Sequence, residues 1–259
     1  MSWQEEYQKA LLDTSANPPD IRKIVDPHIP VKLYKYGSFE NPYWKKVIYK
    51  AQIYFSPAET FNDPFDCRTN INYQKIIRKG DFRKGLIEKF GKEAIENFSE
   101  EMFQKVIEEM RKDVFVFCFS EVWDSILMWA HYANNYNGYC IEYDVKQVKK
   151  YMTDNLYPVL YEKEYIDITD NLIKINDNTG IISNLAKAKE WNYEKEWRMV
   201  KYNKAPFYFK RPLKSIYLGK NCSVSNKQEI IQWAKTQNKK VYTIEASKTQ
   251  YKLKSHREI

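Results

Sequence analysis

The chain has 259 residues, a formal net charge of +8 and aromatic residues at 16% of its positions. An apolar share of 43% argues against a disordered chain. No run approaches the roughly 18 apolar residues that a membrane helix needs. The N-terminus lacks the basic and apolar regions of a secretory signal, and the four cysteines form no C-x-x-C pair. We therefore expect a cytoplasmic protein without a membrane partner.

Hydrophobic periodicity predicts an α+β fold with a mixed or antiparallel sheet. Trp3, Tyr7 and Leu11 lie four apart and indicate an N-terminal helix. Further helices are expected at 43–50, 125–133 with Asp124 as a cap, after Asp144, 183–191, and from the capping box at Ser225 to 233. Strands are expected at 31–36, 52–56, 114–120, 138–144, 157–165, 194–202, 207–210, 215–219, 240–246 and 251–254.

No linker or repeat divides the chain, so we predict a single domain over residues 1–259. Residues 72–112 are charged and have helical spacing, which predicts a helical insert. In 194–202, Trp197 and Met199 alternate with Glu196 and Arg198. This strand is therefore expected to bury one face and present charged side chains on the other.

Charge is concentrated at the C-terminal end. Residues 201–259 contain 14 Lys and Arg against 3 Asp and Glu, whereas residues 1–200 contain 28 against 31. A basic C-terminal segment is typical either of a solvated lysine-rich surface or of a face for nucleic acid. The sequence leaves both interpretations open, because no zinc-finger, helix-turn-helix or RNP signature is present.

Familiar catalytic motifs are absent. The chain has no P-loop and no dinucleotide-binding glycine fingerprint. With only three histidines, no metal site is predicted. Instead, polar residues interrupt apolar segments at a few positions, which makes them candidates for a site: Lys35, Asn62, Asp63, His131, Tyr132, Glu196 and Arg198. Turn formation, a satisfied core histidine or a solvated strand face would also explain them.

Several of these positions lie within strings that resemble an uncharacterised bacterial family, domain of unknown function 2971. The strings are LYKY, YFSPAETFNDPFDC, VFCFSE, LMWAHYANNYNGYCIEYD, WNYEKEWRMV and IYLG. They run in order from about Val31 to about Gly219. This resemblance implies no activity by itself.

A second resemblance is to ADP-ribosyltransferase folds, through LYKYGS, IYFS and YEKEWRMVKY. It implies a split sheet, NAD as the small-molecule nucleotide substrate, and a bacterial toxin or phage-defence effector. Glu196 would be the catalytic acid, with Glu194 completing the E-x-E pattern. Lys35 or Tyr36 would face the ribose and adenosine, and Tyr54 or Phe61 would stack on nicotinamide. Ser56 stands at the second motif of that pattern. The further candidates, Asn62, Asp63, Tyr132 and Arg198 for binding and His131 for catalysis, come from their positions in the chain, since the pattern assigns no role to Asn62, Asp63 or His131.

The implied chemistry is glycosyl transfer. Cleavage of the nicotinamide–ribose bond develops an oxocarbenium ion, which a carboxylate stabilises best where water is excluded.

Two alternatives remain open from the sequence. One is a metal-dependent nuclease or other phosphoryl-processing enzyme, with ligands or bases drawn from Asp63, Asp66, Glu121, Asp124, His131 and Glu142. The other is a non-enzymatic module that docks its basic C-terminal segment on nucleic acid or an acidic protein.

Overall fold

The computed structural model describes residues 1–78, 81–93, 99–112, 114–145, 155–174, 178–201, 207–208 and 213–259. Its α-helices are α1 (Trp3–Leu12), α2 (Ile21–Val25), α3 (Trp44–Tyr49), α4 (Tyr73–Arg78), α5 (Asp81–Phe90), α7 (Glu100–Lys112), α8 (Ile126–Tyr132), α10 (Thr169–Ile173), α11 (Thr179–Leu185) and α12 (Val224–Thr236). Short 3₁₀ helices are η1 (Asp26–His28), η2 (Ala58–Thr60) and η4 (Lys189–Glu194).

The strands form one large sheet and two small ones. They are β1 (Lys32–Gly37), β2 (Gln52–Ile53), β3 (Ser56–Pro57), β4 (Phe115–Ser120), β5 (Tyr139–Asp144), β6 (Leu156–Pro158), β7 (Leu160–Glu162), β8 (Ala186–Ala188), β9 (Glu196–Lys201), β10 (Phe207–Tyr208), β11 (Leu213–Leu218), β12 (Lys240–Ala246) and β13 (Leu253–Arg257). The large sheet has the order β13-β12-β11-β5-β1-β4-β9-β6, with β3 beside β4. Its pairs are antiparallel except β11 with β12, which α12 connects. The expected α+β class with a mixed sheet is confirmed.

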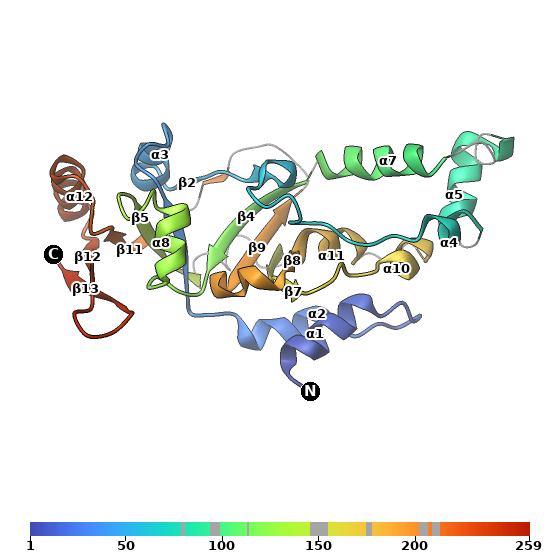
Figure 1. Cartoon of the computed structure of the whole chain (residues 1–259), viewed down its shortest axis with the longest axis horizontal. Coiled ribbons are helices and arrows are strands. Elements are labelled where there is room, and N and C mark those ends of the chain that lie inside the picture. Colours follow the sequence, from blue (N-terminus) through green and yellow to red (C-terminus); the bar gives the residue numbers. More distant parts are fainter. Residues whose placement is uncertain are drawn as a thin grey trace.

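The large sheet is nearly divided between β1 and β4. Strand β1 pairs with β5 along its whole length, from Lys32 to Gly37, and β4 pairs with β9 in the same continuous way. Strands β1 and β4 pair at a single position, where Tyr34 lies opposite Ser120. The two halves of the sheet therefore diverge there. Figure 1 shows β4 and β9 side by side in the middle of the molecule, with β5 and β11 further to the left.

The main core lies on the face of the sheet that α1 and α2 cover. Helix α1 begins with a capping box of Ser2 and Glu5, and it buries Tyr7 and Leu11 against this face. Trp197 and Met199 of β9 belong to the same core. The expected alternation is thus confirmed from Glu196 on, because the other face of β9 carries Glu196 and Arg198. The expected start at Glu194 is wrong, since Glu194 ends η4 before the strand begins.

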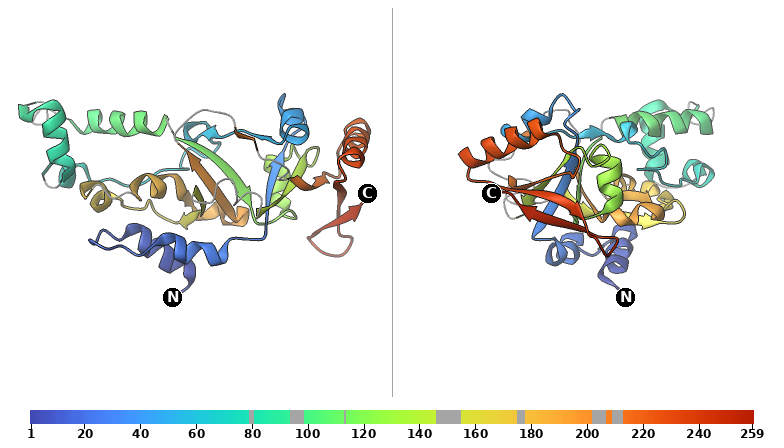
Figure 2. Two further views of the ribbon diagram at one scale, coloured as in Figure 1. Left: turned by 180° about the vertical axis from the view of Figure 1, so that it is seen from behind. Right: turned by 60° about the vertical axis from the view of Figure 1, so that its left-hand side comes forward.

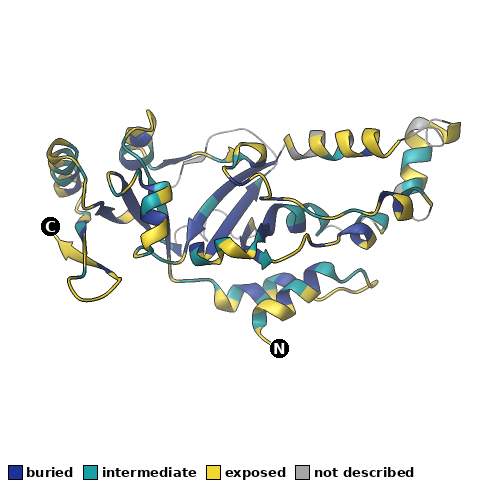
Figure 3. Ribbon diagram, viewed as in Figure 1, coloured by how far each residue is buried: buried dark blue, intermediate teal, exposed yellow. Residues whose placement is uncertain are grey.

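The helices between residues 73 and 112 extend from one end of the sheet, as the two views of Figure 2 show. Tyr73, Ile76 and Phe103 form a separate small cluster that packs with Leu172 of α10. Figure 3 shows the contrast between the buried central strands and the exposed surface of α7. These helices lie in the range where the sequence predicts a helical insert, and the division of the chain into domains stays a prediction.

Several sequence-based boundaries need correction. The helix expected at 183–191 is wrong beyond Leu185, where the chain continues as β8 and then η4. The strand expected at 52–56 is two short pieces, β2 and β3, and Pro57 belongs to the second. The expected strand 157–165 is likewise divided into β6 and β7. The helix expected after Asp144 lies outside the described residues.

Two helix caps also differ from expectation. Ser125, and not Asp124, caps α8 by accepting a hydrogen bond from the Met128 backbone. Ser223, and not Ser225, caps α12. In both cases the residue that caps the helix lies close to the expected one in sequence and has the extended backbone that a cap position requires. Composition alone could not distinguish the two candidates.

Candidate functional site

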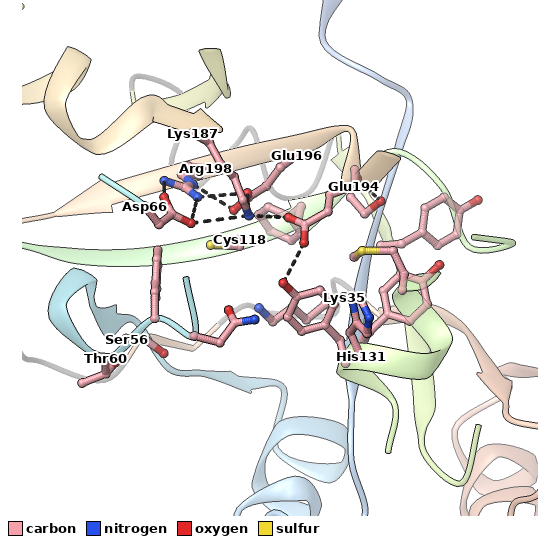
Figure 4. Close-up of a pocket in the computed structure, with 18 residues that line it drawn as sticks. Lys35, Ser56, Thr60, Asp66, Cys118, His131, Lys187, Glu194, Glu196 and Arg198 are labelled. Atoms are coloured by element: carbon pink, nitrogen blue, oxygen red, sulfur yellow. Dashed lines mark hydrogen bonds and ion pairs between the residues drawn. The ribbon is translucent and has the colours of Figure 1, made fainter. Parts of the chain in front are cut away.

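A pocket of about 380 Å³ opens where β1 and β4 diverge (Figure 4). Its walls come from β1, β3, β4, β8, β9, α8, η2, η4 and the loop after η2. The lining residues are Tyr34, Lys35, Tyr36, Ser56, Thr60, Phe61, Asn62, Asp66, Cys118, Phe119, Ser120, Met128, His131, Tyr132, Lys187, Glu194, Glu196 and Arg198. Segments from different parts of the chain thus contribute to one concave site.

Most of the sequence-predicted site residues meet in this pocket. They are Lys35, Tyr36, Ser56, Phe61, Asn62, His131, Tyr132, Glu194, Glu196 and Arg198. Tyr54 and Asp63 do not line it. Tyr54 is exposed and packs on Tyr43, with ring centroids 5.2 Å apart. Asp63 is buried and accepts a hydrogen bond from the Phe65 backbone at 2.8 Å, which is the role of a turn-forming residue.

Arg198 is the buried centre of the charged wall. Its Nε and Nη2 donate to the two carboxylate oxygens of Glu196 at 2.8 and 3.0 Å. Its Nη1 and Nη2 each lie 2.8 Å from an oxygen of Asp66. A further bond from Nη1 reaches the Asn184 carbonyl at 2.8 Å. The planar guanidinium thus satisfies two carboxylates at once, which is the geometry that arginine provides and lysine does not.

Lys187 joins the same cluster from β8. Its ammonium donates to Glu196 Oε2 at 2.9 Å and to Glu194 Oε2, and it lies 3.4 Å from Asp66 Oδ2. All of these side chains are nearly fully buried. Two cations therefore face three carboxylates in a site of low polarisability, where each charge depends strongly on its partners.

The two glutamates of β9 and η4 have opposite pKa shifts. Burial alone would raise the pKa of Glu196, but Arg198 and Lys187 outweigh it and hold that pKa well below its usual range. The pKa of Glu194 is raised, because burial and the charge of Glu196 outweigh the attraction of Lys187. Glu196 therefore stays ionised to lower pH than an ordinary glutamate, whereas Glu194 keeps its proton to higher pH.

Hydrogen-bond saturation also separates these glutamates. Glu196 accepts from Arg198 at both oxygens and from Lys187, and the Cys118 side chain adds a further hydrogen bond. Glu194 Oε1 accepts from Tyr132 at 2.7 Å, and its other oxygen takes Lys187. Glu194 thus keeps more acceptor capacity toward the pocket.

A turn at Lys195 places the two carboxylates. This residue has φ of 44° and ends η4 before β9 begins. Left-handed backbone is uncommon for a side chain other than Gly or Asn, and it is often retained near functional sites. Here it lies between Glu194 and Glu196, both of which line the pocket.

Aromatic side chains and His131 form the rim near α8. Exposed His131 lies 3.1 Å through Nδ1 from the Tyr193 hydroxyl. The rings of Trp191 and Tyr193 lie 6.1 and 6.2 Å from the His131 ring. His131 is therefore not a buried core histidine, because its imidazole reaches solvent at the pocket edge.

The sequence reasoning missed Lys187 and gave Asp66 only a metal-binding role. Lys187 fell within the segment expected to be helical, where a lysine is normally solvated. The short strand β8 pairs instead with β7 and turns this side chain inward. Asp66 follows the turn at Asp63, and its partner Arg198 is too distant in sequence for a local pattern to reveal the pair.

The alternative metal ligands do not assemble in the described part of the chain. No group of three or more His, Cys, Asp or Glu residues there is arranged to hold a metal ion. Of the earlier candidates, Glu142 lies on β5 with Lys32 at 3.2 Å and the Tyr217 hydroxyl at 3.0 Å. Glu121 accepts from the Trp197 indole at 2.7 Å. These carboxylates have structural partners away from the pocket.

Comparison with known proteins agrees with the first resemblance. The family described as Protein of unknown function (DUF2971) matches residues 128–199, from α8 to β9. The segment that matches this family carries His131, Tyr132, Lys187, Glu194, Glu196 and Arg198. No curated protein and no solved structure matches the chain. Within the described residues, no helix has the length and apolar character to span a membrane.

Proposed function

We propose that this pocket is the active site of an enzyme that transfers ADP-ribose from NAD. The observation that carries the proposal is the position of Glu194 and Glu196 at the divergence of β1 and β4. There they face a wall that carries Lys35, Phe61 and His131. This is the combination that glycosyl transfer from a dinucleotide needs: carboxylates, flat apolar surface and cations.

The size and lining of the pocket fit one end of the dinucleotide. A volume of about 380 Å³ lies within the range of small-molecule sites. Phe61 and Tyr132 offer ring surfaces to nicotinamide, and Lys35 offers a cation to the pyrophosphate. Ser56 and Asn62 supply polar groups on the same side of the pocket. The remainder of NAD would extend toward the open rim.

We assign the contact with substrate to Glu194 and a positioning role to Glu196. Glu196 has its oxygens engaged by Arg198 and Lys187, so it fixes these cations and contributes a constant negative charge. Glu194 can exchange its bond with Tyr132 for one with a ribose hydroxyl, since Tyr132 lies at the pocket wall. The resemblance gave Glu196 the catalytic role, and the hydrogen-bond pattern favours its neighbour.

The proposed reaction is a displacement at the anomeric carbon of the nicotinamide ribose. The bond from C1′ to the nicotinamide nitrogen breaks, and its electron pair leaves with nicotinamide. The ionised Glu194 carboxylate stabilises the positive charge that develops on the ribose. A lone pair of the acceptor then forms the new bond to C1′, and the acceptor proton passes to His131, whose exposed imidazole lies at the rim.

The cysteines bear on the compartment that we propose for the protein. All four cysteines are free thiols, which suits the reducing cytoplasm that we propose as its compartment. A role as a toxin or phage-defence effector stays a prediction from the transferase resemblance. The metal-dependent alternative gains no support, because Asp66, Glu194 and Glu196 are already paired with cations.

The test is nicotinamide release from NAD, with NAD binding measured in parallel by calorimetry. We expect release by the wild type and a loss of about 10²–10³-fold in Glu194→Gln, the scale of removing one electrostatic stabiliser. Glu190→Gln is the matched control, because Glu190 is exposed on η4 and lies outside the pocket. Unchanged release by Glu194→Gln would contradict its role. A folded wild type that neither binds nor cleaves NAD would overturn the proposed function.

A further inference from the structure

A second pocket lies at the C-terminal end of the sheet, beside the hairpin of β12 and β13. It has a volume of about 470 Å³ and is separate from the candidate active site. Its lining includes Tyr136 after α8, Lys220 after β11, and the hairpin turn with Lys248, Tyr251 and Lys252. Figure 1 shows this hairpin at the opposite end of the molecule from α5 and α7. The basic C-terminal segment thus forms a concave surface here.

The charged residues that line this second pocket are all basic. Lys220, Lys248 and Lys252 line it, and none of its lining residues is acidic. Lys248 and Lys252 are exposed and belong to the turn of the hairpin. Elsewhere in the described chain, lysines such as Lys45 and Lys227 have carboxylates within 2.8 Å. A pocket lined by three lysines and no carboxylate is suited to a polyanion.

The aromatic residues of the pocket supply a second kind of contact. Tyr251 is 99% exposed, so both faces of its ring are open to a ligand. Tyr136 is fixed differently: its hydroxyl donates to the Ile126 carbonyl at 2.9 Å, and its ring stacks on Trp129. The Lys220 ammonium lies over the Tyr136 ring at 5.3 Å, which holds this cation at the pocket wall.

We propose that this pocket binds a single strand of nucleic acid. Lys220, Lys248 and Lys252 contact successive phosphates, and Tyr251 stacks on an unpaired base. A ring that is fully exposed at the tip of a basic hairpin needs a free π face as its partner, and a single strand offers one. A duplex keeps its bases stacked on one another, and polyphosphate offers charge with no ring. The inference is independent of NAD chemistry, because it concerns a different pocket.

The experiment is fluorescence anisotropy with a labelled 12-nucleotide single strand, at several salt concentrations and without NAD. We expect saturable binding to the wild type that weakens steeply with salt. Tyr251→Ala should weaken binding by about 5- to 150-fold, the scale of one stacked base. Lys248→Gln with Lys252→Gln should reduce the slope of log K against log salt by about 1.4, at about 0.7 for each lysine.

The matched control is Lys9→Gln with Lys23→Gln, which removes the same charge from exposed positions on α1 and α2. We expect this control to keep the wild-type slope. An equal loss of slope in both double variants would overturn the assignment to the hairpin. Equal affinity of Tyr251→Ala for the strand, or equal wild-type affinity for polyphosphate and for the strand, would overturn base recognition. Tighter binding of the duplex would do the same. None of these outcomes bears on NAD cleavage, so they are distinguishable from a failure of the proposed function.

Discussion

Arg198 and Asp66 lie 132 positions apart in the chain, yet two guanidinium nitrogens each lie 2.8 Å from a carboxylate oxygen of Asp66. This pair joins the turn-rich loop after η2 to the middle of β9. Because Arg198 also holds Glu196, one buried side chain fixes the loop, the strand and the charged wall of the pocket together. The side chains that form the charged wall of the pocket therefore also stabilise the fold.

Replacement of Arg198 by Met should destabilise the protein strongly. The change leaves Asp66 and Glu196 as buried carboxylates with Lys187 as their remaining cation. Breaking a buried ion pair in this way costs about 3–5 kcal/mol. Urea denaturation at neutral pH measures the free energy of unfolding. Arg68→Met is the control, since Arg68 is exposed and should change it by less than about 0.5 kcal/mol. A loss below 1 kcal/mol for Arg198→Met would show that the network relaxes around the change.

The raised pKa of Glu194 makes the stability of the wild type depend on pH in a specific direction. Its folded pKa lies above the ordinary glutamate value of about 4.5, so the folded protein holds this proton more tightly than the unfolded chain. Stability from this group is present at low pH and is lost as pH rises above about 4.5 through the folded pKa. Glu194→Gln removes the titration. We expect its stability relative to wild type to increase as pH rises from 4, measured by denaturant unfolding at each pH.

Glu196 should behave in the opposite way. Its folded pKa is lowered, so it contributes stability above the unfolded value of about 4.5 that is lost as pH falls below it. Glu196→Gln should therefore lower the free energy of unfolding most at neutral pH, and the difference from wild type should shrink on acidification. The same unfolding series tests it. A difference that stays constant from pH 7 to pH 3 would show that folding does not lower the pKa of Glu196.

How much of this site was predictable depends on the range over which its residues interact. The alternation of Trp197 and Met199 with Glu196 and Arg198 is a local pattern of two-residue period. It predicted correctly which side chains share a face of β9, although the charged face is buried as well. The strings LYKY and FNDPFD indicated polar residues near strand ends, and most of these meet in the pocket. Local pattern was sufficient wherever strand geometry fixed the direction of a side chain.

What could not be predicted is the pairing of charges across the chain. Lys187 lies in a segment with good helix formers, and tertiary contacts override that propensity by placing β8 beside β7. The saturation of Glu196 likewise depends on partners from two other segments. The near-separation of β1 from β4 is a property of sheet pairing, which no single strand sequence encodes.

A close backbone contact should make Gly219 sensitive to substitution. A Cβ at this position would lie 2.0 Å from the carbonyl oxygen of Tyr136, and backbone at such a contact must shift. We expect Gly219→Ala to lower the free energy of unfolding by about 1–3 kcal/mol, the usual cost of forcing an extra methyl group into a packed site. Gly85→Ala is the matched control with the opposite sign. Gly85 lies in α5 with nothing within 4 Å of the added Cβ, so alanine should stabilise by about 0.5–1 kcal/mol. Equal effects of the two changes would contradict the packing described here.

The hydrogen bond between Tyr132 and Glu194 yields the last prediction, which concerns the pocket directly. The Tyr132 hydroxyl donates to Glu194 Oε1 at 2.7 Å, and this bond lowers the pKa of Glu194 against the effect of burial. Tyr132→Phe should therefore raise that pKa further, so that Glu194 becomes ionised only at higher pH. If the ionised carboxylate is the form that cleaves NAD, the rising limb of nicotinamide release against pH should move to higher pH in this variant. Tyr193→Phe is the control, because the Tyr193 hydroxyl contacts His131 and makes no hydrogen bond to Glu194. A limb that moves in neither variant would show that another group controls the reaction, and a limb that moves equally in both would point to His131.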